Sequence, residues 1–150
     1  MLFPLARLIK VGKKMKFKIL GIPKAKQSFR YTKSGIRYQP KEVKQTEKDI
    51  RQQIIEQLPK DFKPMTGGIW ITKLHFVFPA IAGLSKKKKE LVESEKLPKV
   101  TAPDLENLQK GLNDALEGVV FIRDSQICFL NDVKKLYGTV PRIEIDLEEI

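Results

Sequence analysis

Three acidic side chains in the segment 103–124 could do chemistry together. Asp104 and Glu106 are two residues apart, and Asp124 follows after a helical stretch and a short apolar run. Three carboxylates at one point repel one another unless a cation neutralises them, and hard oxygen ligands suit Mg²⁺ or Mn²⁺. The residue types therefore indicate a divalent metal site, provided that folding brings the three side chains together.

A helix is predicted to carry most of this segment. Pro103 disfavours helix before it, Asp104 is a good N-cap, and Gly118 is a typical C-terminal stop. The apolar residues repeat at helical spacing and comprise Leu105, Leu108, Leu112, Ala115 and Leu116. The opposite, polar face carries Asn107, Lys110, Gly111 and Asp114. Asp104 and Glu106 stand at the N-terminal end of that polar face.

These acids also have an ordinary structural explanation. An Asp at the N-cap and a Glu in the first turn are what the helix dipole favours, and Lys110 with Asp114 fits a surface pair. The strand predicted to begin at Ile127 favours the metal site instead. A strand that returns beside the helix can bring Asp124 next to the helix N-terminus, and we expect that arrangement.

Three sequence blocks here resemble the RusA family of Holliday junction resolvases. They are DLENLQK at 104–110, NDALEG at 113–118 and RDSQI at 123–127, against a family pattern of roughly D-x-D-N-x-x-K, D-A-L and D-D-x-Q-V. The segment GIPKAKQSFRYTKSGIRYQP at 21–40 is similar to the basic N-terminal segment of phage-type members. The resemblance covers about residue 16 to the C-terminus. It implies a metal-dependent, dimeric enzyme that cuts four-way DNA junctions by paired nicks.

The resemblance also implies a role for each matched residue. Asp104, Glu106 and Asp124 would hold one or two Mg²⁺ or Mn²⁺ ions, and Lys110 would position the attacking water or neutralise the transition state. Asn107 and Asp114 would orient the ligands.

Two positions depart from the family pattern. Glu106 stands where the family usually has Asp, which lengthens the carboxylate arm by one methylene. Arg123 stands where the first of two adjacent acids usually lies, so it removes one possible ligand and adds a phosphate-binding cation. Both departures change the set of ligands that the resemblance implies for the metal.

The composition points to a polyanionic partner. The 150 residues suit one domain, and 29 basic against 18 acidic side chains give a net charge of +11. Nucleic acid is the commonest partner of such a surplus. No apolar run approaches the ~20 residues of a membrane span, so we expect no membrane partner. The single cysteine, Cys128, agrees with a reducing cytoplasm and is expected in the core. The expected location is the cytoplasm of a bacterial host cell, with the gene carried by the host, a phage or a prophage.

Two basic segments are candidates for DNA contact. The first, 24–38, interleaves Phe29, Tyr31 and Tyr38 with the basic residues Lys24, Lys26, Arg30, Lys33 and Arg37. Its alternative is a solvated hairpin whose aromatic residues anchor it to the core. The second is the run Lys86, Lys87, Lys88 and Lys89, which either holds a phosphate backbone beside the acids or is simply a solvated face. Arg123 would add a further phosphate contact.

The fold class expected is α+β, with a small mixed or mostly antiparallel sheet and two main helices. Strands are expected at 16–22, 69–78, 127–136 and 142–147, a hairpin at 29–38, and helices at 40–58, 85–93 and 105–117. The strand at 69–78 should be central, with Trp70, Thr72, Leu74, Phe76 and Phe78 sharing one face. Residues 1–14 are expected to be a loosely ordered extension, and 15–150 a single RusA-like domain.

Three functions remain open at this point. The first is a metal-dependent endonuclease that resolves four-way junctions in DNA recombination and repair. The second is a non-catalytic protein that binds structured DNA or RNA, which Arg123 favours. The third is a basic structural protein of a nucleoprotein particle. No Gly-rich phosphate loop, CxxC pair or HExxH is present, which argues against nucleoside-triphosphate, zinc-finger and zincin chemistry.

Overall fold

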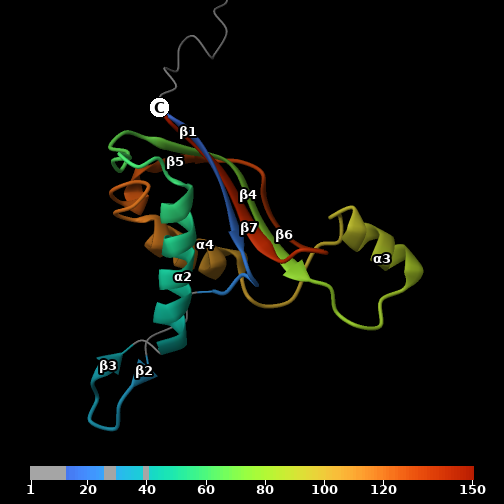
Figure 1. Cartoon of the computed structure of the whole chain (residues 1–150). Helices are drawn as coiled ribbons and strands as arrows, with labels where there is room; N and C mark the ends of the chain where they lie inside the picture. The colour runs from blue at the N-terminus through green and yellow to red at the C-terminus, as the bar shows by residue number, and fades with distance from the viewer. Residues whose placement is uncertain (1–12, 26–29, 39–40) are drawn as a thin grey trace, which may run out of the picture.

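The computed structural model describes residues 13–25, 30–38 and 41–150. It contains a five-stranded mixed sheet, a small hairpin and three helices within those ranges (Figure 1). The expected α+β class is therefore confirmed. The extension expected at residues 1–14 lies outside the described residues except for its last two, and strand β1 (Lys14–Leu20) begins at the second of these.

The sheet has the strand order β1-β7-β4-β5, with β6 also paired to β4. Strand β7 (Arg142–Glu149) is antiparallel to both β1 and β4 (Ile69–Pro79). Strands β5 (Ile127–Leu130) and β6 (Val133–Gly138) follow one another along the other edge of β4 and are parallel to it. The central position expected for 69–78 is confirmed. The hairpin pairs β2 (Arg30–Tyr31) with β3 (Arg37–Tyr38).

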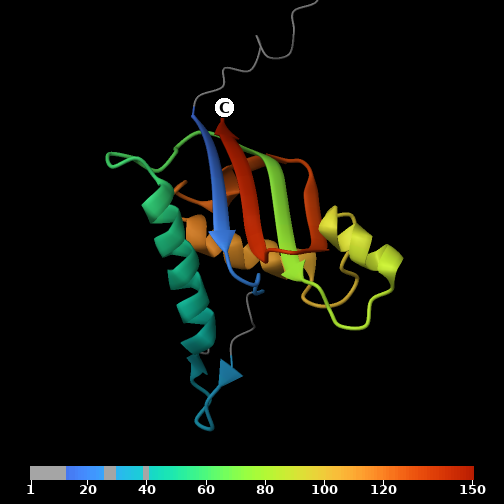
Figure 2. The same cartoon turned by 45° about the vertical axis from the view of Figure 1, so that its right-hand side comes forward.

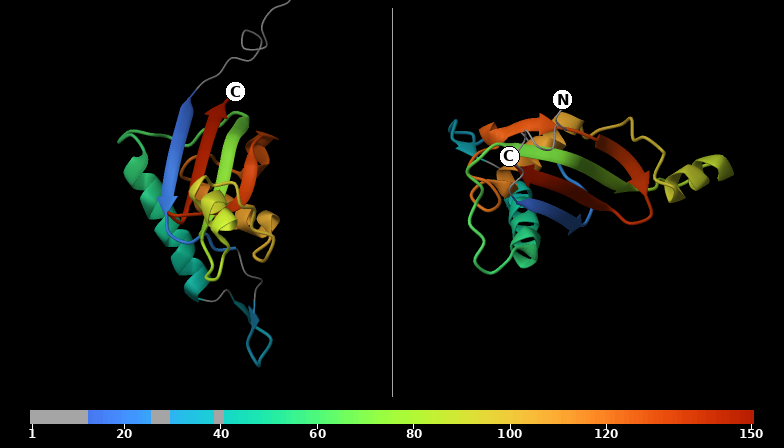
Figure 3. Two further views of the ribbon diagram at one scale, coloured as in Figure 1. Left: turned by 90° about the vertical axis from the view of Figure 1, so that its right-hand side faces the viewer. Right: turned by 90° about the horizontal axis from the view of Figure 1, so that it is seen from above.

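The helices surround this sheet unevenly. Helix α4 (Leu105–Leu116) lies across one face, behind the strands in Figure 2, and buries Leu108, Leu112, Ala115 and Leu116. Helix α2 (Lys41–Gln57) lies beside β1 and contributes Ile50 and Ile54 to the same core. Helix α3 (Lys86–Glu93) stands apart from both (Figure 3). Each helix in the described ranges is too short or too polar to cross a lipid bilayer.

A bulge in β4 changes which side chains share a face. The pairing of β4 with β7 shifts register between Ile71 and Lys73. Ile69 and Ile71 are therefore fully buried in the same core as Leu74 and Phe76. Trp70 lies on the other side, where its ring packs on Phe129 at a centroid distance of 5.8 Å. The expectation of one uninterrupted alternation through 69–78 was wrong, because an extra residue in the strand reverses the alternation.

The stretch expected as one strand at 127–136 is two strands. Asp132 has a φ of 48°, in the left-handed region, and lies between β5 and β6. Cys128 is exposed, so its expected place in the core was wrong. The reason is that β5 is a sheet edge, and three of its four residues are exposed.

The sheet face opposite α4 carries charges that are paired across the strands. The lysines of β1 and β4 meet acids of β7 as Lys14–Glu148 (3.6 Å), Lys16–Asp146 (4.0 Å), Lys18–Glu144 (3.9 Å) and Lys73–Glu144 (3.5 Å). Desolvation acts to raise the pKa of Glu144, but Arg142, Lys73 and Lys18 outweigh it and hold that pKa below its ordinary value. We call the sheet surface that carries these ion pairs the paired sheet face.

Candidate active site at the ends of helix α4

The N-terminal end of α4 presents two exposed carboxylates. Asp104 is the N-cap residue, with an extended backbone (φ −67°, ψ 143°), but its side chain makes no capping hydrogen bond. Glu106 lies in the first turn and pairs with Lys110 at 3.2 Å, four residues on. Both side chains of that pair are mostly exposed (80% and 60%), so the pair is weak and exchangeable. Among the described residues, the Asp104 carboxylate has no partner.

Asp124 lies at the other end of the same helix. Its backbone N–H donates to Glu117 Oε1 at 3.0 Å, and Glu117 is the C-cap residue of α4. The 12 residues of α4 span ~18 Å at 1.5 Å per residue. Asp124 is therefore far from Asp104 within one chain, and the expectation that a returning strand brings them together was wrong. No group of three His, Cys, Asp or Glu side chains within the described part of the chain could hold a metal ion.

The chain turns back where it does because Gln126 fixes the turn. Gln126 ends a short 3₁₀ helix (Asp124–Gln126), and its side-chain oxygen accepts from the N–H groups of Ile122 (2.9 Å) and Arg123 (2.8 Å). Its side-chain nitrogen donates to the carbonyls of Met65 (2.8 Å) and Gly67 (2.9 Å). One amide thus joins the Asp124 turn to the segment before β4. Gln126 was visible in the RDSQI block, but the sequence did not indicate this role.

The polar face of α4 is present as predicted. Asn107 and Asp114 are both half-buried there, and Lys110 is exposed. Arg51 of α2, which the sequence did not single out, donates to the carbonyls of Asp114 (2.9 Å) and Ala115 (3.2 Å). A cation at the carbonyl end of a helix is favourable, so Arg51 fixes the end of α4 next to the Asp124 turn.

The predicted DNA-binding residues lie on exposed projections. The side chains of Lys24, Lys33, Arg37 and Arg123 are exposed, and so are all four lysines at 86–89. The hairpin extends beyond the start of α2, and α3 projects from another side of the molecule (Figure 1). Lys26 and the side chain of Arg30 lie outside the described residues. As predicted, Ser85 caps α3, accepting a hydrogen bond from the N–H of Lys88 at 3.3 Å.

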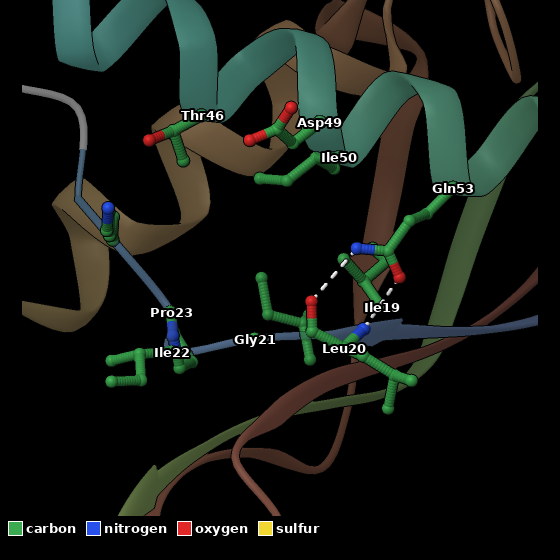
Figure 4. Close-up of a pocket in the computed structure, with 11 residues that line it drawn as sticks. Ile19, Leu20, Gly21, Ile22, Pro23, Thr46, Asp49, Ile50 and Gln53 are labelled. Carbon is green, nitrogen blue, oxygen red and sulfur yellow. Dashed lines mark hydrogen bonds between the residues drawn. The ribbon is translucent and has the colours of Figure 1, made fainter.

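A pocket of ≈160 Å³ lies elsewhere, between α2 and the segment after β1 (Figure 4). Its wall includes the buried Ile19 and Ile50, and Asp49 is the acid among its lining residues. Gln53 closes one side by bonding both backbone groups of Leu20, at 2.8 Å to the N–H and 2.9 Å to the carbonyl. With a single carboxylate, this pocket is a poorer metal site than the end of α4.

The N-terminal end of α4 has the donor chemistry that a hard divalent ion requires. Mg²⁺ keeps several waters and is typically bound by one or two carboxylates together with substrate phosphates. Within the described part of the chain, Asp104 offers a carboxylate without a partner, and Glu106 offers one whose partner is the exposed Lys110. These residues fit such an ion.

Comparison with known proteins identifies the family of this chain. A family model described as Endodeoxyribonuclease RusA matches residues 21–148. The chain belongs to the RusA endodeoxyribonuclease family. The match spans both ends of α4 and the two basic projections of this RusA-family chain.

A relative among curated proteins is the uncharacterized protein YqaN of Bacillus subtilis (strain 168). The two are 38% identical over 78 residues, which is 52% of this RusA-family chain and 54% of YqaN. The match thus covers about half the length of this relative.

Proposed function

We propose that this protein is a divalent-metal-dependent endonuclease that resolves four-way DNA junctions by paired nicks. The observation that carries the proposal is the Asp104 carboxylate, which has no partner among the described residues and stands two residues before Glu106 of the Glu106–Lys110 pair, inside the region that matches the RusA family. A bound Mg²⁺ or Mn²⁺ ion would activate water and stabilise charge on the attacked phosphate. The work of such an enzyme belongs to DNA recombination or repair in the bacterial cytoplasm.

The residues of this chain would divide the remaining tasks. Asp104 and Glu106 would bind the ion, and Lys110 would leave its pair with Glu106 to neutralise charge on the phosphate. Asn107 and Asp114, on the same face of α4, would orient these groups. The exposed lysines of α3 and the basic hairpin would hold the arms of the junction by phosphate contacts.

The position of Asp124 is explained if two copies act together. In a two-fold dimer, a contact of residue i with residue j is always repeated as a contact of j with i. Two antiparallel α4 helices would therefore place Asp104 and Glu106 next to Asp124 of the partner subunit, and would do so twice. Two equivalent sites are what two symmetric nicks require. Support for this arrangement comes from the opposite ends of α4 at which the acids lie.

A nicking assay tests the proposed activity. The protein is incubated with a synthetic four-way junction, a linear duplex and a flap, each with Mg²⁺, Mn²⁺ or a chelator. We expect metal-dependent paired nicks in the junction and much slower cutting of the other two substrates. Binding of the junction without cutting in either metal would favour the second function, a non-catalytic holder of structured nucleic acid, which the exposed Arg123 also fits.

Mixed dimers test whether the site is shared. Asp104→Asn and Asp124→Asn protomers carry different tags, are co-expressed, and the dimer with both tags is isolated. Each variant alone should be inactive. In the mixed dimer, one site combines the intact Asp104 of one protomer with the intact Asp124 of the other, and the second site lacks both acids. The mixed dimer should therefore cut one strand only. An inactive mixed dimer would show that the site is not shared, and sedimentation showing only monomers would rule out the dimer.

A further inference from the structure

Lys135 of β6 reaches the segment that leads into α4. Its Nζ donates to the carbonyls of Thr101 and Pro103, both at 2.8 Å. The Pro103 carbonyl belongs to the peptide bond that joins Pro103 to Asp104. The Lys135 side chain therefore holds the peptide group directly before one of the two carboxylates at the N-terminal end of α4.

The segment that Lys135 holds is otherwise open to solvent. Thr101 and Ala102 are exposed, and Val100 has 88% of its surface exposed. Two contacts from Lys99 help to join it to β6. The Lys99 N–H donates to the Lys135 carbonyl at 3.0 Å, and Lys99 Nζ donates to Thr101 Oγ1 at 2.8 Å. Both lysine ammonium groups make charge-assisted bonds to this segment, but of the two only Lys135 bonds to Pro103, the residue directly before Asp104.

We propose that Lys135 is a positioning residue for the metal-binding carboxylates. By fixing the two carbonyls, it sets the start of α4 and thereby the relative placement of Asp104 and Glu106. Lys135 itself contacts neither ion nor DNA. A metal site needs its ligands held within ~0.5 Å of the productive geometry, and an exposed loop alone does not hold them so closely. The part of this inference that concerns the ion rests on the proposed function, and the part that concerns the loop does not.

The neighbouring residue supplies a matched control. Lys134 is on the same strand, but its side chain pairs with Asp132 at 3.3 Å and is 55% exposed. Lys134→Met and Lys135→Met each remove one lysine from β6. Only Lys135→Met removes the bonds to the Thr101 and Pro103 carbonyls. Lys135→Arg keeps charge and donors and should restore part of any loss.

The first measurement is hydrogen exchange, which needs no activity. The Leu108 N–H closes the first turn of α4 by donating to the Asp104 carbonyl at 3.0 Å. Lys135→Met should speed exchange of that amide by about tenfold, because the turn opens more often once its anchor is gone. Lys134→Met should leave it within about twofold. Equal exchange in both variants would overturn the proposal. Should Lys135→Met fail to fold, Lys135→Gln replaces it, with the same expected direction.

The second measurement is metal affinity, by Mn²⁺-induced relaxation of water protons in the full-length protein. Outer partners of metal ligands typically contribute 10- to 100-fold in affinity, so Lys135→Met should weaken Mn²⁺ binding by about 10-fold or more. Lys134→Met should not. Faster exchange with unchanged Mn²⁺ affinity would overturn the positioning role, since Lys135 would then be merely structural. If the wild type binds Mn²⁺ but cuts no junction, the proposed function fails while the comparison of Lys135 with Lys134 still decides this inference.

Discussion

The paired sheet face and the ends of α4 hold their charges in opposite ways. On the sheet, acids of β7 pair with lysines of β1 and β4. Glu144, for example, pairs with Lys18 at 3.9 Å and with Lys73 at 3.5 Å. At the ends of α4, within the described ranges, the Asp104 and Asp124 carboxylates have no partner. Paired charges neutralise one another and add to stability, whereas unpaired ones remain available to an ion or a phosphate. Because the lysines of the paired sheet face have acidic partners, most of the excess positive charge (+11 in total) lies away from the sheet.

The largest effect expected from this contrast is at Asp104. Asn caps a helix as well as Asp does, so Asp104→Asn should leave the free energy of unfolding within ~0.5 kcal/mol. Junction cutting in Mg²⁺ should fall by about 10²-fold or more, since the metal loses a charged ligand. Junction binding should persist or tighten, because a negative charge near the phosphates is removed. The control is Glu148→Gln on the paired sheet face, which should leave cutting unchanged. Normal cutting by Asp104→Asn would show that Asp104 is not part of the active site.

The next effect concerns the lysines of α3. Replacing Lys86, Lys87, Lys88 and Lys89 by Gln should lower the salt slope of DNA binding by ~1 for each phosphate that the variant no longer neutralises. The control replaces Lys14, Lys16 and Lys18 by Gln, because these lysines already have acidic partners. That variant should keep its salt slope and lose stability instead. Equal slopes for the wild type and the α3 variant would mean that the run is only a solvated surface.

A smaller change is expected at Glu106. Glu106→Asp shortens the carboxylate arm by one methylene, which changes the geometry offered to the ion. Mg²⁺ demands near-ideal octahedral coordination, so the ratio of Mg²⁺- to Mn²⁺-supported cutting should shift by a few-fold, while junction affinity stays the same. An unaltered ratio would indicate that Glu106 does not touch the ion.

The smallest effect belongs to the paired sheet face. The pKa of Glu144 is lowered from 4.5 by its cationic neighbours, against desolvation. Its stabilisation is therefore fully present above pH 4.5 and is lost as the pH falls through the lowered pKa. Glu144→Gln should cost about 1 kcal/mol or less at pH 7, and the two proteins should converge in stability in acid. Cutting at pH 7 should not change. A pH-independent difference in urea unfolding would contradict this account.

Local sequence signals predicted the helices well and the long-range placements poorly. Asp104, Gly118 and the leucine spacing predicted α4, and Gly118 has the positive φ (78°) expected just past a helix end. Ser85 likewise predicted the start of α3. Such signals act over one or two turns of chain and are therefore readable from the residues themselves.

The missed features all depend on distant partners. The bulge near Thr72 is set by pairing with β7, about seventy residues away, and nothing near Thr72 marks it. The position of Asp124 follows from the docking of Gln126 on Met65 and Gly67. Lys135 resembles any lysine of an alternating strand until the fold brings Thr101 and Pro103 to it.

The glutamines of α2 have a consequence for self-association. Gln53 and Gln57 each bond both backbone groups of a β1 residue, Leu20 and Lys18, much as a neighbouring strand would. A second molecule cannot extend the sheet there without first displacing the helix. Open-ended stacking into fibres needs two sheet edges with free backbone groups, and in this protein Gln53 and Gln57 already bond part of the β1 edge. Pairing at an edge is therefore favoured on the β5 side, and two molecules joined through their β5 edges leave no further β5 edge for a third.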